Sequence, residues 1–329
     1  MLKKIGRNNL IIWILGVTLL WYVLILSIIE EVLFSPWMLN LVGLTDISSG
    51  MRFVIEMYLS TIIPFIGILV YTGVTKRNRF VLKSFLPGYM NNGMKTLLQG
   101  LLVGFVMNFG CILCALLHGD IKLYFDFAVS GIPLMIFALV CVFIQSTSEE
   151  LWCRGFVYER INVKYPLWVA IAINGVFFGA LHLFNPGANF LSIFDIVLCG
   201  FGFSIAKWYT GSIWFPMGIH TAWNFTQNFI FGLPNSGLVS ETSIFTLDAA
   251  NARTTWVYDA AFGVEGAVPA VVADAVLGSV CLMLAATKGR LKELGMTRAE
   301  LMGEEQPGEE LCGEVPRGEE PHSEEQTCD

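Results

Sequence analysis

The sequence predicts an all-α, polytopic membrane protein with about eight transmembrane helices. Hydrophobic residues make up 55% of its 329 residues, charged residues make up only 14%, and the mean hydropathy is +0.63. Apolar runs of about 20 residues, long enough to cross a bilayer as a helix, recur along the chain. Basic residues gather in alternate connections between these runs, which is the charge pattern of an integral membrane protein. The composition therefore excludes an ordinary soluble domain.

The predicted spans divide the chain into four parts. Three spans form an N-terminal part, residues 1–130, and four spans form a core, residues 131–232. An outer loop and the last span occupy residues 233–290, and an acidic disordered tail occupies residues 291–329. The fifth span is the shortest, and the fourth is either long or broken near its acidic residues. The eight spans are Leu10–Ile29, Phe53–Thr75, Leu97–Leu117, Ile132–Phe156, Leu167–Leu183, Phe190–Trp208, Ile213–Phe231 and Val264–Ala286.

The positions of the basic residues predict the orientation in the membrane. If both termini lie in the cytoplasm, eight spans place seventeen of the 20 Lys and Arg residues on the cytoplasmic side. Only Arg52, Lys122 and Arg253 fall outside. A missing or extra span would spoil this agreement with the positive-inside rule. We therefore expect a multi-pass protein of the plasma membrane, in contact with membrane lipids, with both termini in the cytoplasm.

The acidic charge is concentrated in the tail. The net charge is -7, but residues 300–329 alone carry eleven acids and one arginine. The tail combines high charge with low hydrophobicity, so it is expected to stay disordered. The rest of the chain is mildly basic and has no basic stripe interleaved with aromatic residues, so nucleic acid is not an expected partner. The long outer segment, Gly232 to Gly263, is predicted to be either an ordered lid or a flexible loop.

Two adjacent carboxylates and an arginine end the fourth apolar run. Charged side chains inside a bilayer are costly and usually serve a function there. Glu150 and Arg154 are four residues apart, on one face of a helix, and can form an ion pair. Glu149 points about 100° away from Glu150 around the helix. We expect Glu149 to be the working carboxylate and the neighbouring ion pair to hold its helix in place.

Two histidines lie in or at the ends of predicted spans, each with a polar or aromatic neighbour one helical turn away. Phe178 precedes His182 by four residues, and Asn224 follows His220 by four residues. A carboxylate, two imidazoles and an amide can activate water and hold the oxyanion that forms when water attacks a peptide carbonyl.

Further acidic residues fall within the apolar runs, among them Glu56, Asp195 and Asp274. We expect Glu56 to have a structural or supporting role. Asp195 and Asp274 have no partner motif and are left out of the predicted site.

Together, the motifs Glu149-Glu150-x-x-x-Arg154, Phe178-x-x-x-His182 and His220-x-x-x-Asn224 resemble the CAAX prenyl protease type 2 family, also called CPBP or Abi-like intramembrane proteases. The resemblance covers about residues 130–232. It implies an eight-helix membrane fold with a catalytic cavity open toward the cytoplasmic leaflet, and an intramembrane endopeptidase that cleaves a membrane-associated or lipid-modified protein or peptide.

The resemblance also implies roles for individual residues. Glu149 and His182 would activate the water, while His220 and Asn224 would polarise the carbonyl and hold the oxyanion. Glu150 and Arg154 would orient their helix, with Phe178 in a supporting position. A zinc ion held by Glu149, His182 and His220 would match the three protein ligands of a catalytic zinc site. A metal-free mechanism with Glu149 as the base fits equally well.

Two questions stay open from the sequence. The first is geometric, because His220 lies about 11 Å into its span from the inner end and His182 more than about 20 Å. Tilted helices, or a fifth span that begins deep in the membrane, would bring the two histidines level. The second is functional, because the same polar cavity would also suit a non-proteolytic transporter or a bacteriocin-immunity binding protein.

Overall fold

The computed structural model describes residues 10–44 and 46–303, and within these residues it is almost entirely helical, with one two-stranded sheet. Elements labelled η are short 3₁₀ or π helices. The N-terminal part contains α2 (Leu10–Thr18), η1 (Leu19–Leu26), α3 (Ser27–Leu33), α4 (Pro36–Leu41), α5 (Ser49–Val54), η2 (Ile55–Leu59), α6 (Ile62–Val74), η3 (Lys76–Asn78), α7 (Arg79–Phe85) and α8 (Met94–His118). The rest contains β1 (Leu123–Phe125), η4 (Val129–Gly131), α9 (Ile132–Glu150), η5 (Leu151–Val157), α10 (Tyr158–Asn162), α11 (Leu167–Leu181), α12 (Phe190–Thr210), α13 (Trp214–Phe225), η6 (Thr226–Ile230), β2 (Phe245–Leu247), η7 (Val264–Gly266), α14 (Val268–Thr287), η8 (Leu291–Gly295) and α15 (Arg298–Met302).

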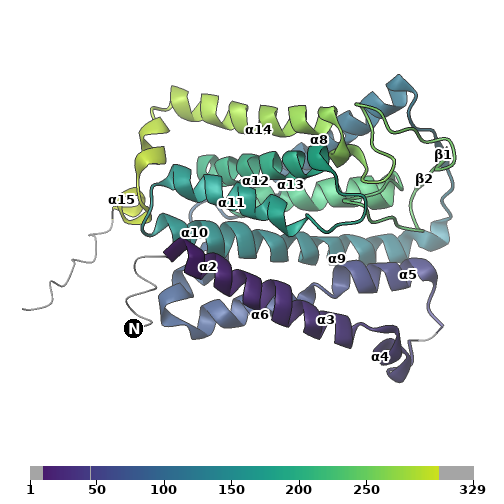
Figure 1. Ribbon diagram of the computed structural model, residues 1–329, viewed down its shortest axis with the longest axis horizontal. Helices are drawn as coiled ribbons and strands as arrows, with labels where there is room; N and C mark the ends of the chain where they lie inside the picture. Colours follow the sequence, from purple (N-terminus) through teal and green to yellow (C-terminus); the bar gives the residue numbers. More distant parts are fainter. Residues whose placement is uncertain (1–9, 45, 304–329) are drawn as a thin grey trace, which may run out of the picture.

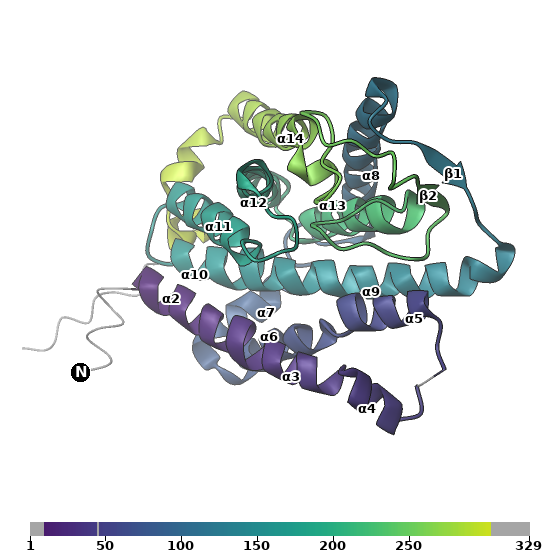
Figure 2. The same ribbon diagram turned by 45° about the vertical axis from the view of Figure 1, so that its right-hand side comes forward.

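The helix α9 runs along the length of the molecule and continues through η5 into α10 without a break. In Figures 1 and 2 it separates α2, α3 and α6 on one side from α11, α12, α13 and α14 on the other. The fourth predicted span is therefore long rather than broken. The π-helical segment η5 directly follows the adjacent carboxylates Glu149 and Glu150. Such π segments often occur at functional sites.

The helical content confirms the predicted fold class. Six helices of the described chain are long and apolar enough to cross a membrane by length and composition: Leu10–Leu41, Ser49–Val74, Met94–His118, Val129–Asn162, Phe190–Thr210 and Val268–Thr287. A shorter apolar helix, Leu167–Leu181, coincides with the shortest predicted span. The protein is therefore a polytopic all-α membrane protein, and the number of eight spans stays a prediction.

Glycines allow the helices around the core to approach closely. A Cβ on Gly100 would lie 2.1 Å from the carbonyl oxygen of Phe215, and one on Gly104 would lie 2.3 Å from that of Ile219. Both glycines belong to α8, and both carbonyls belong to α13. Small residues at such crossings let membrane helices pack backbone to backbone. This contact fixes the position of α13, which carries His220.

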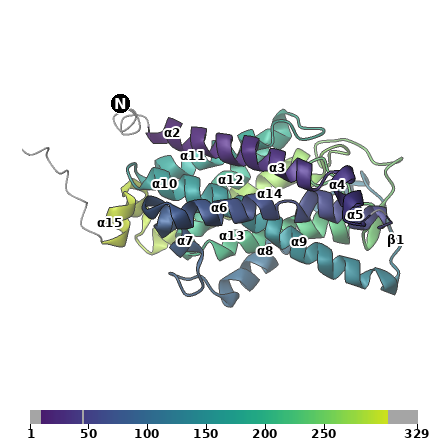
Figure 3. The ribbon, with the colours of Figure 1, turned by 90° about the horizontal axis from the view of Figure 1, so that it is seen from below.

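The connections rich in basic residues gather at one end of the molecule. The helices α7, α10 and α15 lie at that end, whereas β1 and β2 lie at the other (Figures 1 and 3). This arrangement agrees with the predicted sidedness, although the orientation in the membrane stays a prediction. One basic residue was misassigned, because Arg154 was counted with the cytoplasmic connections. It is fully buried inside the bundle, where Glu150 pairs with it.

Two predictions about the connecting segments can be assessed. The outer segment 232–263 is ordered, since β2 pairs with β1 and Asn235 bridges to Leu238. The predicted disordered tail begins too early, because η8 and α15 occupy residues 291–302. Ion pairs hold this part: Arg290 binds Glu293 at 3.0 Å, and Arg298 lies 3.5 Å from Glu159. The remaining tail residues, 304–329, lie outside the described part of the chain.

Candidate active site

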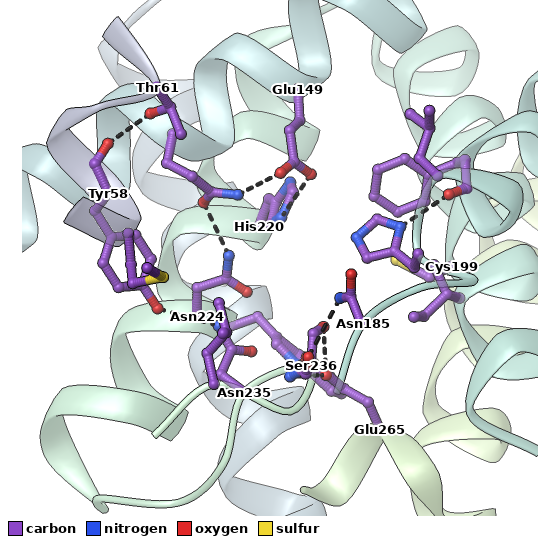
Figure 4. Close-up of a pocket in the computed structure, with 18 of the residues that line it drawn as sticks. Tyr58, Thr61, Glu149, Asn185, Cys199, His220, Asn224, Asn235, Ser236 and Glu265 are labelled. Atoms are coloured by element: carbon purple, nitrogen blue, oxygen red, sulfur yellow. Dashed lines mark hydrogen bonds and ion pairs between the residues drawn. The ribbon is translucent and has the colours of Figure 1, made fainter. Parts of the chain in front are cut away.

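A cavity of about 320 Å³ lies between the central helix and the helices on both sides of it. Its walls include Glu149 from α9, Phe178 from α11, His182 at the end of that helix, and His220 and Asn224 from α13. The structure thus brings residues of all three predicted motifs to one cavity. Figure 4 shows Glu149 and His220 facing each other, with Asn224 nearby.

Glu149 is held by a glutamine that the sequence analysis overlooked. The side-chain Nε2 of Gln145, one turn earlier on α9, donates to Glu149 Oε1 over 2.5 Å. Gln145 Oε1 in turn accepts from Asn224 Nδ2 at 3.1 Å. The other carboxylate oxygen, Glu149 Oε2, has no hydrogen-bond donor among the described residues and lies 3.8 Å from His220 Nε2. One oxygen is therefore anchored by Gln145, and the other is buried beside His220 without a hydrogen-bond donor in the described chain.

Glu150 and Arg154 form the ion pair that their spacing predicts. Arg154 Nη1 donates to Glu150 Oε1 over 3.0 Å, and both side chains are completely buried. The same carboxylate oxygen lies 3.1 Å from His220 Nδ1. The guanidinium carbon of Arg154 lies 4.1 Å from the centre of the Phe178 ring, in a cation–π contact. The pair thus connects α9 to both histidine-bearing segments.

His182 follows directly after the last residue of α11, and its orientation is set by its own helix. Its Nδ1 lies 2.9 Å from the backbone oxygen of Phe178, which can only accept a hydrogen bond. Nδ1 is therefore the protonated nitrogen in the neutral ring, and Nε2 is left as an acceptor. The rings of Phe178 and His182 are 4.9 Å apart and cross edge to face.

The sequence suggested that His182 and His220 lie at different depths in the membrane. The short length of α11 explains how they can reach the same cavity. The helix α11 has only 15 residues, and His182 caps its C-terminal end. The Phe178 ring contacts both imidazoles, with its centre 4.9 Å from His182 and 6.1 Å from His220. A single aromatic side chain therefore separates the two histidines, and both face the same cavity.

A metal does not fit the described residues as the zinc alternative requires. No group of three or more His, Cys, Asp or Glu side chains in residues 10–44 and 46–303 is arranged to hold a metal ion. Both histidines engage Nδ1, His220 with Glu150 and His182 with a backbone carbonyl, which leaves each Nε2 free, as in a metal-bound histidine. The spacing of Glu149, His182 and His220, not the orientation of the rings, is therefore what departs from a zinc site.

Several residues of the cavity wall were absent from the predicted site. Asp195 and Asp274, which were left out, line the cavity, and so do Glu30 from α3 and Glu265 from η7. Gln145 could have been found from the sequence, because it lies four residues before Glu149 on the same helical face. Glu265 has no such motif partner, because it lies in the short helix η7 and its hydrogen-bond partners, Trp223 and Ser236, are distant in the sequence.

Glu56 lies outside the cavity, and its supporting role stays a prediction. Its Oε1 lies 3.7 Å from Arg52, one turn earlier in the chain, and the two side chains form an ion pair between α5 and η2. It does not line the cavity that contains Glu149.

Two comparisons with known proteins bear on this geometry. Residues 131–226, which contain every predicted site residue, match the family described as type II CAAX prenyl endopeptidase Rce1-like. A protein of Bacillus subtilis (strain 168) named "Uncharacterized protein YyaK" is 28% identical over 208 residues, which cover 60% of this chain and 68% of that protein. The resemblance to the CAAX prenyl protease type 2 family is therefore confirmed over residues 131–226, and it points to a protease of the CAAX type.

Proposed function

We propose that this protein is an intramembrane endopeptidase that hydrolyses a peptide bond in a membrane-associated or lipid-modified protein or peptide. The observation that carries the proposal is the shared cavity, into which Glu149, His182, His220 and Asn224 all project from three helical segments. Each group has a partner that fixes its orientation, as a preorganised catalytic site requires.

Glu149 is the proposed general base. Gln145 fixes one carboxylate oxygen at 2.5 Å, while the other, Oε2, has no donor within the described chain. A water placed beside Oε2 would lose its proton to this oxygen as its own oxygen attacks the carbonyl carbon. The proton would then pass to the amine of the leaving peptide. The bond between carbonyl carbon and nitrogen breaks, and a new carboxylate forms.

His182 is the second group proposed to orient the water. Because its Nδ1 is engaged with the Phe178 carbonyl, Nε2 is an acceptor in the neutral ring. An acceptor from His182 and an acceptor from Glu149 would bind the two hydrogens of one water. This arrangement would aim an oxygen lone pair at the carbonyl carbon.

His220 and Asn224 are the proposed oxyanion donors. An amide nitrogen carries two hydrogens, and Asn224 uses one for Gln145, which leaves one for a substrate oxygen. His220 Nδ1 faces Glu150, so Nε2 donates only when the ring is doubly protonated. Donors aimed at an oxyanion commonly contribute about 10²–10³-fold in rate each.

The outer segment is proposed to close the cavity on the side of the β strands. Asn235, Ser236 and Leu238 line the cavity, and Ser236 is tied to Glu265 by a backbone and a side-chain hydrogen bond. Closing this side would restrict bulk water and leave substrate entry to the lipid and the opposite end.

The test compares membranes that contain the wild-type protein with membranes that contain Glu149→Ala, His182→Ala or His220→Ala. If the proposal is correct, one or more precursor proteins accumulate in all three variants, and mass spectrometry finds the same missing cleavage. Equal abundance of each variant in the membrane shows that folding is retained.

The same experiment distinguishes the non-proteolytic alternative. A transporter or an immunity binding protein leaves the mass of its ligand unchanged. Normal processing of every membrane protein in all three variants would reject the endopeptidase.

A further inference from the structure

Two buried carboxyl groups form a wall of the cavity that the proposed catalytic steps do not use. Asp195 from α12 is 1% exposed, and Asp274 from α14 is 4% exposed. Both line the cavity that contains Glu149 and His182. Figure 4 shows Cys199, one turn after Asp195 on α12, facing the cavity on a side away from Glu149.

Close helix packing brings these two carboxyl groups to the same wall. A Cβ on Gly202 of α12 would lie 3.3 Å from the carbonyl oxygen of Asp274. A Cβ on Gly278 of α14 would lie 3.7 Å from the Cα of Gly202. Glycines at a helix crossing allow this approach, and larger residues would force the helices apart. The contact between α12 and α14 therefore determines where both acids lie.

Neither carboxyl group is satisfied by the protein. No hydrogen bond or ion pair to Asp195 or Asp274 is present within the described chain, and Asp195 Oδ1 is buried without a partner. The nearby Glu265 is different, because it accepts from Trp223 Nε1 at 2.8 Å and from the Ser236 backbone at 2.7 Å. Buried polar groups in folded proteins almost always have partners. The exception points to a partner that comes from outside the protein.

The charge around the cavity indicates which kind of partner this is. The described residues that line it include five carboxyl side chains and no lysine or arginine. The nearest arginine, Arg154, is engaged with Glu150 at 3.0 Å. Lys207, farther along α12, is engaged with Glu159 at 2.5 Å. An ionisable residue inside the membrane normally pairs with an opposite charge, and no lysine or arginine of the described chain forms an ion pair with Asp195 or Asp274.

We infer that Asp195 and Asp274 form a subsite for a cationic side chain, lysine or arginine, of the peptide substrate. The assignment of this cation to a peptide rests on the proposed protease function. A cavity of about 320 Å³ is at the small end of ligand pockets, so the basic residue lies within about two residues of the bond that is cut. The subsite would select such substrates because an uncharged side chain leaves both carboxyl groups unpaired.

The first experiment measures binding without any cleavage. Full-length protein in nanodiscs of neutral lipid is titrated with butylguanidinium chloride and with butylurea, its uncharged counterpart of the same shape. Wild type is expected to bind the cation at least about tenfold more tightly than the urea. The variant Asp195→Asn/Asp274→Asn is expected to lose this preference. The control Asp126→Asn, an exposed acid outside the cavity, is expected to keep it.

Two results of the titration would overturn the subsite. Equal binding of the cation and the urea by wild type would mean that the two carboxyl groups share a proton and need no ligand. A preference for the cation that persists in Asp195→Asn/Asp274→Asn would place the cation at another acid, such as Glu149, and the Glu149→Gln variant would then lose it.

The second experiment connects the subsite to substrate choice. A peptide library with acetylated N-termini, in which only side chains carry positive charge, is incubated with wild type and with Asp195→Asn/Asp274→Asn. Lysine and arginine are expected to be enriched beside the cleavage sites of wild type but not of the variant. Cleavage without enrichment contradicts the subsite alone. Absence of cleavage by wild type contradicts the proposed protease, while the titration still decides the cation site.

Discussion

The side chain of Gln145 donates a hydrogen bond to Glu149 at 2.5 Å, and it accepts one from Asn224 at 3.1 Å. This glutamine joins the proposed base, Glu149, to a proposed oxyanion donor, Asn224. Asn224 follows Gln145 by 79 residues in the sequence. The orientation of each therefore depends on the other. The same connection explains why Glu149 Oε1 is fixed, whereas Oε2 has no hydrogen-bond donor in the described chain.

The first prediction concerns Gln145. Replacing it by leucine removes a donor to a carboxylate, an interaction that contributes about 1.5–3 kcal/mol. We expect Gln145→Leu to lower kcat about 10–100-fold, because the Glu149 carboxylate is no longer held in one orientation. Gln99→Leu, on an exposed position of α8, serves as the control. An unchanged kcat in Gln145→Leu would contradict this role of Gln145.

The second prediction concerns the buried ion pair. Arg154→Met leaves Glu150 buried without its cation, which costs about 3–5 kcal/mol in comparable cases. We expect a matching loss in the free energy of unfolding, measured by denaturation in detergent micelles. The double variant Glu150→Leu/Arg154→Met should recover much of this loss, since no unpaired charge remains. Strictly additive effects of the two substitutions would show that the pair is not coupled.

The third prediction concerns the contact between α8 and α13. Gly104→Ala places a Cβ 2.3 Å from the carbonyl oxygen of Ile219, next to His220, so α13 must move. We expect lower thermal stability and a loss of proteolysis of at least about tenfold, since small displacements of catalytic groups are costly. Gly110→Ala on the same helix has nothing within 4 Å of the new Cβ and should leave both properties unchanged. Equal behaviour of the two variants would disprove the close contact.

The fourth prediction concerns Lys207. Its Nζ donates to the backbone oxygen of Arg154 at 2.7 Å, within the π-helical segment, and to Glu159 at 2.5 Å. Lys207→Met removes both bonds, so the segment that carries Arg154 should loosen. We expect faster hydrogen exchange in residues 151–157 and reduced activity. Lys292→Met, an exposed lysine near the C-terminal segment, should change neither. Unchanged exchange in Lys207→Met would contradict this role.

The fifth prediction concerns pH and the segment η8. Hydrogen bonds from Arg290 lower the pKa of Glu293 below its ordinary value, and the indole of Trp208 adds a further bond at 2.9 Å. A lowered carboxyl pKa contributes stability above the ordinary carboxyl range, which is lost as the pH falls through the lowered pKa. Hydrogen exchange of residues 291–295, corrected for the intrinsic effect of pH, should therefore increase on acidification.

The variant Glu293→Gln provides the comparison for this pH effect. It should show the faster exchange already at neutral pH and little further change on acidification. If the wild type and Glu293→Gln respond alike to acid, the attachment of η8 does not depend on Glu293.

The sequence alone determined the features that repeat locally. Hydrophobic runs predicted the helices, since burial in lipid needs about 20 apolar residues whatever their neighbours. Spacings of four residues predicted the Glu150–Arg154 pair, because a helix fixes which residues share a face. The three motifs together also predicted that Glu149, His182 and His220 meet in one cavity.

Only the tertiary structure decided the contacts between distant segments. Gln145 bonds Asn224, Lys207 bonds the backbone oxygen of Arg154, and Asp195 faces the same cavity as Asp274, each across a contact between two helices. Residues 291–302 were predicted to belong to the disordered tail, yet η8 and α15 form there, and Arg290 and Glu293 find partners on α12. Such contacts depend on how closely two helices pack and at which residue they cross. Neither quantity is encoded in the periodicity of a single segment.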